Sequence, residues 1–441
     1  MSKTVGMISL GCPKNQVDAE IMLKKLVDAG YLLVDEADKA DVVIVNTCAF
    51  IEDSKKESID SILEMVDYKE DGSLRCIVVT GCLAQRYADE VFEEIPEVDA
   101  VVGVGANDDI VSICDTVLAG EKCSSFPEKE KMPLEGGRIL TTPEYFAYLR
   151  IADGCSNCCS YCAIPSIRGK FRSRAMEDVI DEAKALCEKG VKELILVAQD
   201  TTRYGEDLYG EVRLPQLLDE LNKIEGLEWI KLLYCYPERI TDELISAINR
   251  NSKVCNYIDM PMQHVSGKIL KAMNRPGDRE SLTALVNKLR EKIEGVVIRT
   301  TFITGFPGEN EEDFTALSEF VNEMKLDRVG CFAYSREENT PAYDFPEQVE
   351  KQVASDRAEI IMEQQYRVNE ENLEKLMGKT FDVIVDGYDT YTDSYFGRTY
   401  MDAPEIDNNI IFTSGYEIEI GEIVPVEIFD KDEYSLIGEA V

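Results

Sequence analysis

The strongest constraint on the fold is a regular alternation of apolar and amphipathic segments in the middle of the chain. Apolar segments of strand length recur there, and each of the first five is followed by an amphipathic segment of helix length. The expected strands are residues 146–152, 193–198, 229–236, 254–260, 296–304 and 328–334, and the expected helices lie near 176–189, 215–224, 242–250, 280–294 and 312–325. Strands that alternate with helices form a parallel sheet, and these strands are too few to close a full barrel. We therefore predict an α/β fold with an open, partial (β/α)6 barrel whose ligands bind at the carboxyl ends of its strands.

The residues before this barrel show a second alternation of the same kind. Apolar runs lie at residues 5–10, 42–45, 77–79 and 100–104, and residues 17–29 have a helical pattern. Continuous apolar strands are typical of parallel sheets that are buried on both faces. We predict an N-terminal doubly wound α/β domain over residues 1–125, a linker with prolines and glycines over residues 126–143, and the partial barrel over residues 144–346.

The C-terminal part changes from helical to strand periodicity. A long polar helix is expected over residues 347–378, and short segments with strand character follow at 380–385, 410–413, 416–420 and 423–429. We predict a small antiparallel β-barrel over residues 379–441. This part is strongly acidic, with 15 Asp and Glu residues against Lys379, Arg398 and Lys431.

Charge and composition exclude several classes of function. Lys and Arg total 47 and Asp and Glu total 85, so the net charge is −38, which repels phosphate and makes duplex nucleic acid a poor substrate. The one histidine, His264, argues against a histidine-based zinc hydrolase and against a Ser-His-Asp triad. No apolar segment is long enough for a membrane span, and the first residues lack the apolar segment of a signal peptide. We expect a cytoplasmic protein without a membrane partner.

The cysteines indicate metal or redox chemistry, because 14 thiols in a cytoplasmic chain stay reduced. Cys155, Cys159 and Cys162 form a C-x3-C-x2-C array directly after the first barrel strand. Three thiolates on one short loop suit an iron–sulfur cluster and leave one iron open for an exogenous chelating ligand. The alternative is zinc bound by two C-x2-C pairs, which would use Cys158 as well, but such pairs are normally separated by a long spacer. We therefore interpret Cys158 as a loop residue and not as a ligand.

A second set of three cysteines occupies equivalent positions in the N-terminal domain. Cys12, Cys48 and Cys82 each follow the carboxyl end of an expected strand, where open α/β sheets bind their ligands. The alternative is that they are ordinary buried cysteines, as we expect for Cys76 and Cys114. Their equivalent placement after three strands favours three thiolates that converge on one edge of the sheet.

The C-x3-C-x2-C array, with an aromatic residue between its last two cysteines, and the six strand–helix units resemble the radical S-adenosylmethionine enzymes. The resemblance implies a 4Fe-4S cluster on the array, whose open iron is chelated by S-adenosylmethionine. In such enzymes the reduced cluster donates one electron to the sulfonium, which releases methionine and a 5′-deoxyadenosyl radical. The contacts that it implies for S-adenosylmethionine are Tyr161 near the adenine, Gln199 and Asp200 near the methionine end, and Thr304, Gly305 and Gly308 of the T-G-F-P-G-E segment near the nucleoside.

The motifs G-C-P-K-N at Cys12, N-T-C at Cys48 and T-G-C-L at Cys82 resemble the N-terminal signature of methylthiotransferases. This resemblance covers essentially the whole chain. It implies a second 4Fe-4S cluster on these three cysteines, a C-terminal TRAM barrel, a sulfur donor and a low-potential electron donor. It also implies that a substrate carbon activated by the radical gains a methylthio group.

The substrate distinguishes two branches of that family. Pro13 in the G-C-P-K-N motif is similar to the branch that modifies the β-carbon of an aspartate in small-subunit ribosomal protein S-twelve, free or in the subunit. The branch that modifies isopentenylated adenosine in tRNA typically has glutamine at this position. The acidic C-terminal barrel agrees with the first branch, because it attracts a basic ribosomal protein and makes tRNA an unlikely partner. The tRNA activity is the alternative, and a non-catalytic iron–sulfur sensor on the ribosome is an alternative of another class.

Two further features near the expected site have both a functional and a structural interpretation. A basic run after the cysteine array either meets a carboxylate of the target or of S-adenosylmethionine, or forms a solvated or salt-bridged face. The run consists of Arg168, Lys170, Arg172 and Arg174. His264 follows the fourth barrel strand, and we expect a structural hydrogen bond there and not acid–base catalysis.

Overall fold

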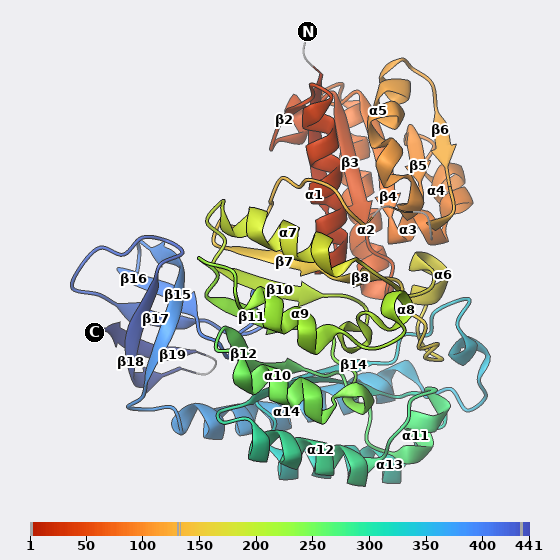
Figure 1. The fold of residues 1–441 in the computed structure, drawn as a ribbon. Coiled ribbons are helices and arrows are strands. Elements are labelled where there is room, and N and C mark those ends of the chain that lie inside the picture. Colours follow the sequence, from red (N-terminus) through yellow and green to blue (C-terminus); the bar gives the residue numbers. More distant parts are fainter. Residues whose placement is uncertain (1–2, 130–131, 133, 433–434) are drawn as a thin grey trace.

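The computed structural model describes residues 3–129, 132, 134–432 and 435–441, and three sheets follow one another along the chain (Figure 1). The first sheet is parallel, in the order β2-β1-β3-β4-β5-β6. Its strands are β1 Thr4–Ser9, β2 Leu32–Leu33, β3 Val42–Thr47, β4 Cys76–Gly81, β5 Ala100–Val102 and β6 Cys123–Ser125. Its helices are α1 Pro13–Asp28, α2 Glu52–Glu70, α3 Cys82–Arg86, α4 Ala88–Glu94 and α5 Ile110–Leu118. The central strands β3 and β4 are buried along their whole length, which confirms the predicted α/β sheet.

The second sheet is an open parallel sheet in the order β14-β13-β12-β11-β10-β7, and its helices lie on the outside (Figure 1). Its strands are β7 Phe146–Arg150, β10 Glu193–Val197, β11 Trp229–Leu232, β12 Val254–Asp259, β13 Val297–Thr304 and β14 Arg328–Ala333. Its helices are α6 Ile164–Arg168, α7 Met176–Cys187, α8 Glu206–Tyr209, α9 Leu214–Leu221, α10 Asp242–Arg250, α11 Gly267–Ala272, α12 Arg279–Lys292 and α13 Glu311–Met324. Because β7 and β14 are the unpaired edges, the partial (β/α)6 barrel is confirmed. A small antiparallel pair, β8 Ala152–Asp153 and β9 Arg172–Ser173, flanks the cysteine array.

The third sheet is a closed barrel in the order β15-β16-β17-β19-β18. Its strands are β15 Thr380–Asp389, β16 Ser394–Arg398, β17 Ile410–Thr413, β18 Ile423–Lys431 and β19 Leu436–Ala440. The expected barrel is present, but its pairing is antiparallel with one exception, since β17 and β19 run parallel. The strand expected at residues 416–420 is wrong, because this segment is a connection that exposes Tyr416 and Ile420.

The long helix α14, Lys351–Glu374, connects the second and third sheets and packs against β14 and α13. The segment expected as a linker, residues 126–143, includes residues 130, 131 and 133, which lie outside the described residues. Its described part runs beside α1, where the Ile139 amide donates to the Glu20 carbonyl. Among the described residues, no helix combines the length and the apolar character that a bilayer span requires.

A buried ionic cluster joins the C-terminal barrel to the strands of the central sheet. Glu193 on β10 accepts hydrogen bonds from Lys231 Nζ on β11 at 2.6 Å and from Arg398 Nη1 on β16 at 2.7 Å. Arg398 Nε also donates to Asp386 of β15 at 2.8 Å. Burial alone would raise the pKa of Glu193, but Arg398 and Lys231 hold it below its ordinary value. The carboxylate is therefore the anion shared by two buried cations from different sheets.

We expect Glu193→Gln to lower the free energy of unfolding by about 3 kcal/mol or more, because it leaves Lys231 without its buried counter-ion. Urea denaturation followed by fluorescence and circular dichroism measures this loss. The matched control is Glu220→Gln, which removes an exposed pair with Lys223 and costs less than about 1 kcal/mol. Equal losses in the two variants would contradict the importance of the buried cluster.

Candidate functional site

The C-x3-C-x2-C array forms the loop between β8 and α6. Cys155 and Cys159 are buried and Cys162 is half-buried. Gly154 has a φ of +75°, and a Cβ there would lie 2.2 Å from the Lys170 carbonyl oxygen, so only glycine fits before Cys155. The loop is held further by the Cys155 amide, which donates to the Gly169 carbonyl at 3.1 Å. The three thiols are thereby presented on one compact loop.

The three thiols of the array are shielded from solvent and lie close to one another. The pKa of Cys162 is raised to about 12, chiefly by burial and also by the nearby Cys159 and Cys155, while the Ile164 amide lowers it. The Tyr236 hydroxyl lies 3.8 Å from Cys159 Sγ. Because a metal binds thiolates, assembly of a cluster on this loop must release protons. The donor set of three soft sulfurs fits an iron–sulfur cluster.

Cys158 differs from its three neighbours. It is exposed, its backbone has a φ of +54°, and its Sγ lies 3.6 Å from the Ser156 carbonyl oxygen. Its side chain therefore points to the solvent, whereas Cys155 and Cys159 are enclosed.

Three of the residues expected to bind S-adenosylmethionine lie next to the cysteine loop. Gln199 Nε2 donates to Asp153 Oδ1 at 3.0 Å, and Asp200 Oδ2 accepts from the Asn157 amide at 2.8 Å. Gln199 Oε1 and Asp153 Oδ2 are buried atoms without a hydrogen-bond partner in the described structure. Tyr161 packs beside Phe306 in the small apolar cluster below the loop. Unpaired buried acceptors at this position fit a ligand that carries N–H donors, such as the amino group of S-adenosylmethionine.

The glycine-rich segment at the end of β13 turns toward α14. Thr304 Oγ1 donates to the Ala354 carbonyl at 2.9 Å, and a Cβ on Gly305 would lie 2.1 Å from the Ala354 Cβ. Glu309, the last residue of this segment, accepts from the Gly305 amide at 2.9 Å. Gly308 has a φ of +84° and its amide donates to the Glu347 carbonyl. These contacts give the turn its shape without using an external ligand.

The three N-terminal cysteines converge as predicted at the carboxyl ends of β1, β3 and β4. Burial raises the pKa of Cys82 to about 12, Arg168 lowers it, and the nearby Cys48 and Cys12 raise it. The backbone just before Cys12 lies close to Cys48, because a Cβ on Gly11, whose φ is +88°, would lie 2.8 Å from Cys48 Sγ. In the part of the chain that the structure describes, no three His, Cys, Asp or Glu side chains are grouped to hold a single metal ion. Three thiols are the kind of donor set that iron–sulfur clusters use.

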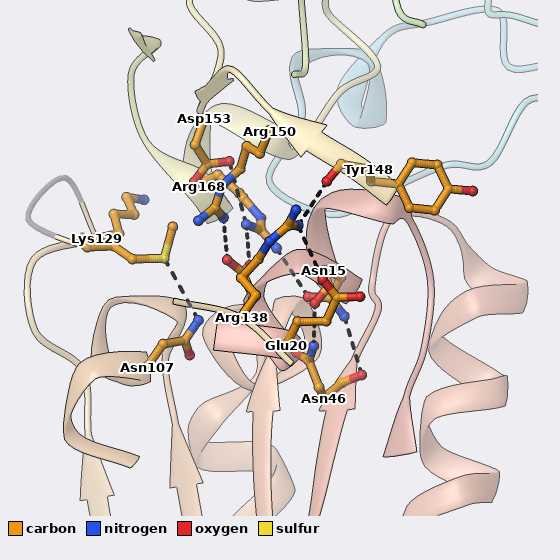
Figure 2. A network of polar contacts seen from close by, with 12 residues as sticks. Asn15, Glu20, Asn46, Asn107, Lys129, Arg138, Tyr148, Arg150, Asp153 and Arg168 are labelled. Atoms are coloured by element: carbon orange, nitrogen blue, oxygen red, sulfur yellow. Dashed lines mark hydrogen bonds and ion pairs between the residues drawn. The ribbon is translucent and has the colours of Figure 1, made fainter. Parts of the chain in front are cut away.

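A buried polar network, part of which Figure 2 shows, joins Asn15 and the neighbouring residues of α1 to Arg150, Asp153 and Arg168. Arg168 Nη1 donates to Asp18 Oδ2 at 2.7 Å and lies 3.5 Å from Asp153 Oδ1, while Nη2 donates to Asn15 Oδ1 at 3.1 Å and lies 4.0 Å from Cys82 Sγ. Asp18 is shared, because its other oxygen accepts from Arg150 of β7. One guanidinium thus contacts the residue two positions before Cys155 and the thiol of Cys82.

Arg168 and Arg174 of the basic run form salt bridges with carboxylates of the chain itself. This agrees with the interpretation of the run as a salt-bridged face. Arg174 pairs with Glu135 and Glu182, and Arg172 donates to the carbonyls of Met132 and Lys129. His264 is also structural in its contacts, since its Nδ1 accepts from the Ser266 amide at 2.9 Å and its Nε2 lies 3.4 Å from Glu309 Oε2.

The residues that join the two triads were not expected from the sequence. Asn15 and Asp18 were not singled out, although they lie one helical turn apart on α1, directly after Cys12. Lys14 belongs to the same motif and is buried; its Nζ lies 3.4 Å from the centroid of the Tyr234 ring. Burial lowers the pKa of Lys14, but the Tyr234 hydroxyl and Cys12 outweigh burial and raise it. The sequence feature that could have identified these residues is the helical spacing of polar side chains on the face of α1 that packs against the rest of the protein.

Three family models match consecutive parts of the chain. They are "Uncharacterized protein family UPF0004" over residues 4–103, "Radical SAM superfamily" over residues 149–321 and "TRAM domain" over residues 377–441. The first two contain the N-terminal cysteines and the C-x3-C-x2-C array, respectively.

Several curated proteins named ribosomal protein uS12 methylthiotransferase RimO, where uS12 is protein S-twelve, are similar to the chain over its length. The protein from Desulforamulus reducens is 48% identical, with 99% of both chains covered. The protein from Caldanaerobacter subterraneus is 50% identical, with 99% of this chain and 100% of the relative covered. The protein from Clostridioides difficile is 48% identical over 99% of this chain and 98% of the relative.

Solved structures share the fold at low identity. The radical S-adenosylmethionine methyltransferase TsrM from Kitasatospora setae matches with a TM-score of 0.56 and 14% identity, over 78% of this chain and 77% of that one. The cobalamin-dependent S-adenosylmethionine radical enzyme OxsB matches with a TM-score of 0.53 and 13% identity, over 83% of this chain and 57% of that one.

We expect Cys159→Ser to lose the iron of one cluster, about four atoms per chain, while Cys158→Ser keeps it. The two variants change adjacent thiols in the same way, so each is the control for the other. The physical reason is that Cys159 is enclosed with the other thiols of the array and Cys158 faces solvent. Iron and acid-labile sulfide are measured after anaerobic reconstitution. Loss of iron from the Cys158 variant would contradict the assignment of the array.

Proposed function

The chain belongs to the family of radical S-adenosylmethionine methylthiotransferases that act on ribosomal protein uS12, and we propose that it adds a methylthio group to the β-carbon of an aspartate in that protein. Its fold is that of the radical S-adenosylmethionine enzymes. The observation that carries the proposal is the buried network through Asp18 and Arg168, which couples two separate groups of three thiols within one protein.

Both thiol groups hold 4Fe-4S clusters in this proposal. Cys155, Cys159 and Cys162 bind the cluster that binds S-adenosylmethionine, and Cys12, Cys48 and Cys82 bind the second one. When bound, the first cluster and one S-adenosylmethionine would supply the radical, a second S-adenosylmethionine would supply the methyl group, and the second cluster would supply the sulfur of the methylthio group. The support for two clusters is the matching chemistry of the two donor sets and the contact of Arg168 with both loops.

Residues of the chain itself orient the cofactor. Gln199 and Asp200 lie at the end of β10 beside the cysteine loop, and the unpaired Oε1 of Gln199 accepts a hydrogen bond from the amino group of S-adenosylmethionine. Tyr161 lines the adenine side, and the turn of Thr304, Gly305 and Gly308 lies on the nucleoside side. The shaped turn is rigid before the cofactor binds, since its hydroxyl and amides are already hydrogen-bonded.

Charge supports a basic protein as the substrate. The net charge of −38 repels a tRNA backbone and favours encounter with a basic ribosomal protein, free or in the small subunit. Turnover further requires a low-potential electron donor and a sulfur donor, because one electron is used for each radical and one sulfur leaves with each product. The protein acts in the cytoplasm, where thiols stay reduced.

The substrate is tested by incubating the reconstituted protein, S-adenosylmethionine and a reductant with uS12 and, separately, with tRNA that carries isopentenylated adenosine. We expect uS12 to gain the mass of one methylthio group on an aspartate, together with formation of 5′-deoxyadenosine. A mass gain on tRNA alone would overturn the choice of substrate. Absence of 5′-deoxyadenosine would favour a non-catalytic iron–sulfur protein.

The second cluster is tested by counting iron and sulfide in a variant that lacks the N-terminal triad. We expect about eight irons in the parent and about four in the variant with Cys12, Cys48 and Cys82 changed to alanine, since each cluster of this type contains four. The variant should still cleave S-adenosylmethionine but should not form the methylthio product. An unchanged iron content would refute the second site.

A further inference from the structure

Lys14 stands apart from the other buried cations of the protein. Its exposed fraction is 6%. Every other described Lys or Arg that is buried lies within 4.0 Å of a carboxylate oxygen. These residues are Arg138, Arg150, Arg168, Arg174, Lys231, Arg275, Arg357 and Arg398. Among the described residues no such contact is found for Lys14, so it is a buried ammonium group without a carboxylate partner.

The position of Lys14 is between the two cysteine triads. It lies in the first turn of α1, two residues after Cys12, and its Nζ lies 3.4 Å from the centroid of the Tyr234 ring. Tyr234 follows the carboxyl end of β11, and Tyr236, two residues further along, reaches Cys159 with its hydroxyl. A single strand end therefore touches the lysine beside one triad and a thiol of the other.

The physical chemistry of this position calls for an anion. A buried charge is costly unless it is paired, and lysine is almost never fully buried without a partner. The Tyr234 ring stabilises the ammonium through a cation–π contact, which is weaker than a buried carboxylate pair. The neighbouring cation, Arg168, is already bound to Asp18 and Asn15 and also lies 3.5 Å from Asp153 Oδ1, so its charge is already compensated by carboxylates of the chain. Lys14 is thus the cation left to receive an anion from outside the chain.

We propose that Lys14 binds the side-chain carboxylate of the target aspartate and so determines the specificity for aspartate, an inference that rests on the proposed function. The carboxyl carbon of aspartate is bonded directly to the β-carbon. A carboxylate held at Lys14 therefore holds the β-carbon between the triad that supplies the radical and the triad that supplies sulfur. An asparagine at the same position of the substrate can accept a hydrogen bond from Lys14 but cannot form an ion pair with it.

The test compares equilibrium binding of uS12 and of uS12 with the target aspartate changed to asparagine, to the anaerobically reconstituted full chain. We expect the parent protein to bind the aspartate form at least about tenfold more tightly, because the ion pair with Lys14 is lost with asparagine. In Lys14→Met this ratio should fall to about one. Lys223→Met, which changes an exposed lysine far along the chain, is the matched control and should keep the parent ratio.

A second measurement needs no variant of the enzyme. Zero-length carbodiimide coupling of the parent protein with uS12 should form an amide between Lys14 and the target aspartate, with loss of water, and peptide mass mapping locates that bond. The asparagine form of uS12 should give no such product. A parent ratio near one, a ratio that persists in Lys14→Met, or coupling maps without this bond would each reject the inference.

Two further outcomes separate this inference from others. If Lys14→Met binds S-adenosylmethionine more weakly and keeps the aspartate preference, the carboxylate at Lys14 belongs to the cofactor and the inference is wrong. If the parent protein adds no methylthio group to uS12, the proposed function fails, and this inference fails with it. If the parent does so and the binding ratio does not depend on Lys14, only this inference fails.

Discussion

The structure depends on one carboxylate, Asp18, that is shared by two buried arginines. Arg150 belongs to the edge strand of the central sheet, and Arg168 ends the helix that follows the cysteine array. Asp18 belongs to α1, the helix that begins directly after Cys12. Because two cations in a dry interface are destabilised without their anion, the N-terminal sheet is fixed to the barrel at the place where both triads lie. The relative position of the two triads is a consequence of this interaction.

Much of the fold was predictable because buried parallel strands leave continuous apolar segments in the sequence. The strands from β7 to β14 are of this kind, and so are β3 and β4. The short edge strands β2 and β6 were missed, since their two or three residues carry no pattern. The segment 416–420 alternates like a strand but lies at the surface, and β16 and β19, which do pair, contain glycines that interrupt the pattern. Which segments pair in a closed barrel depends on neighbouring strands that are distant in the sequence, so a local pattern does not reveal it.

The positions of the cysteines were also predictable, because their spacing on a loop and their placement directly after a strand are local features of the sequence. The network between the triads was not. Arg168 and Asp18 are separated by 150 residues, and only the packing of α1 against β7 brings them together. The burial of Lys14 likewise arises from two elements, α1 and the end of β11, that are far apart in the chain.

The shared carboxylate of Glu193 has a consequence for how a large partner is handled. Its two cations come from β11 and β16. Rotation of the C-terminal barrel would therefore separate Arg398 from Glu193 and leave buried charges without their partners. The C-terminal barrel is therefore held in one orientation relative to the central sheet. A large partner that bound to the barrel would therefore be held in a fixed orientation relative to the strands that carry the two cysteine triads.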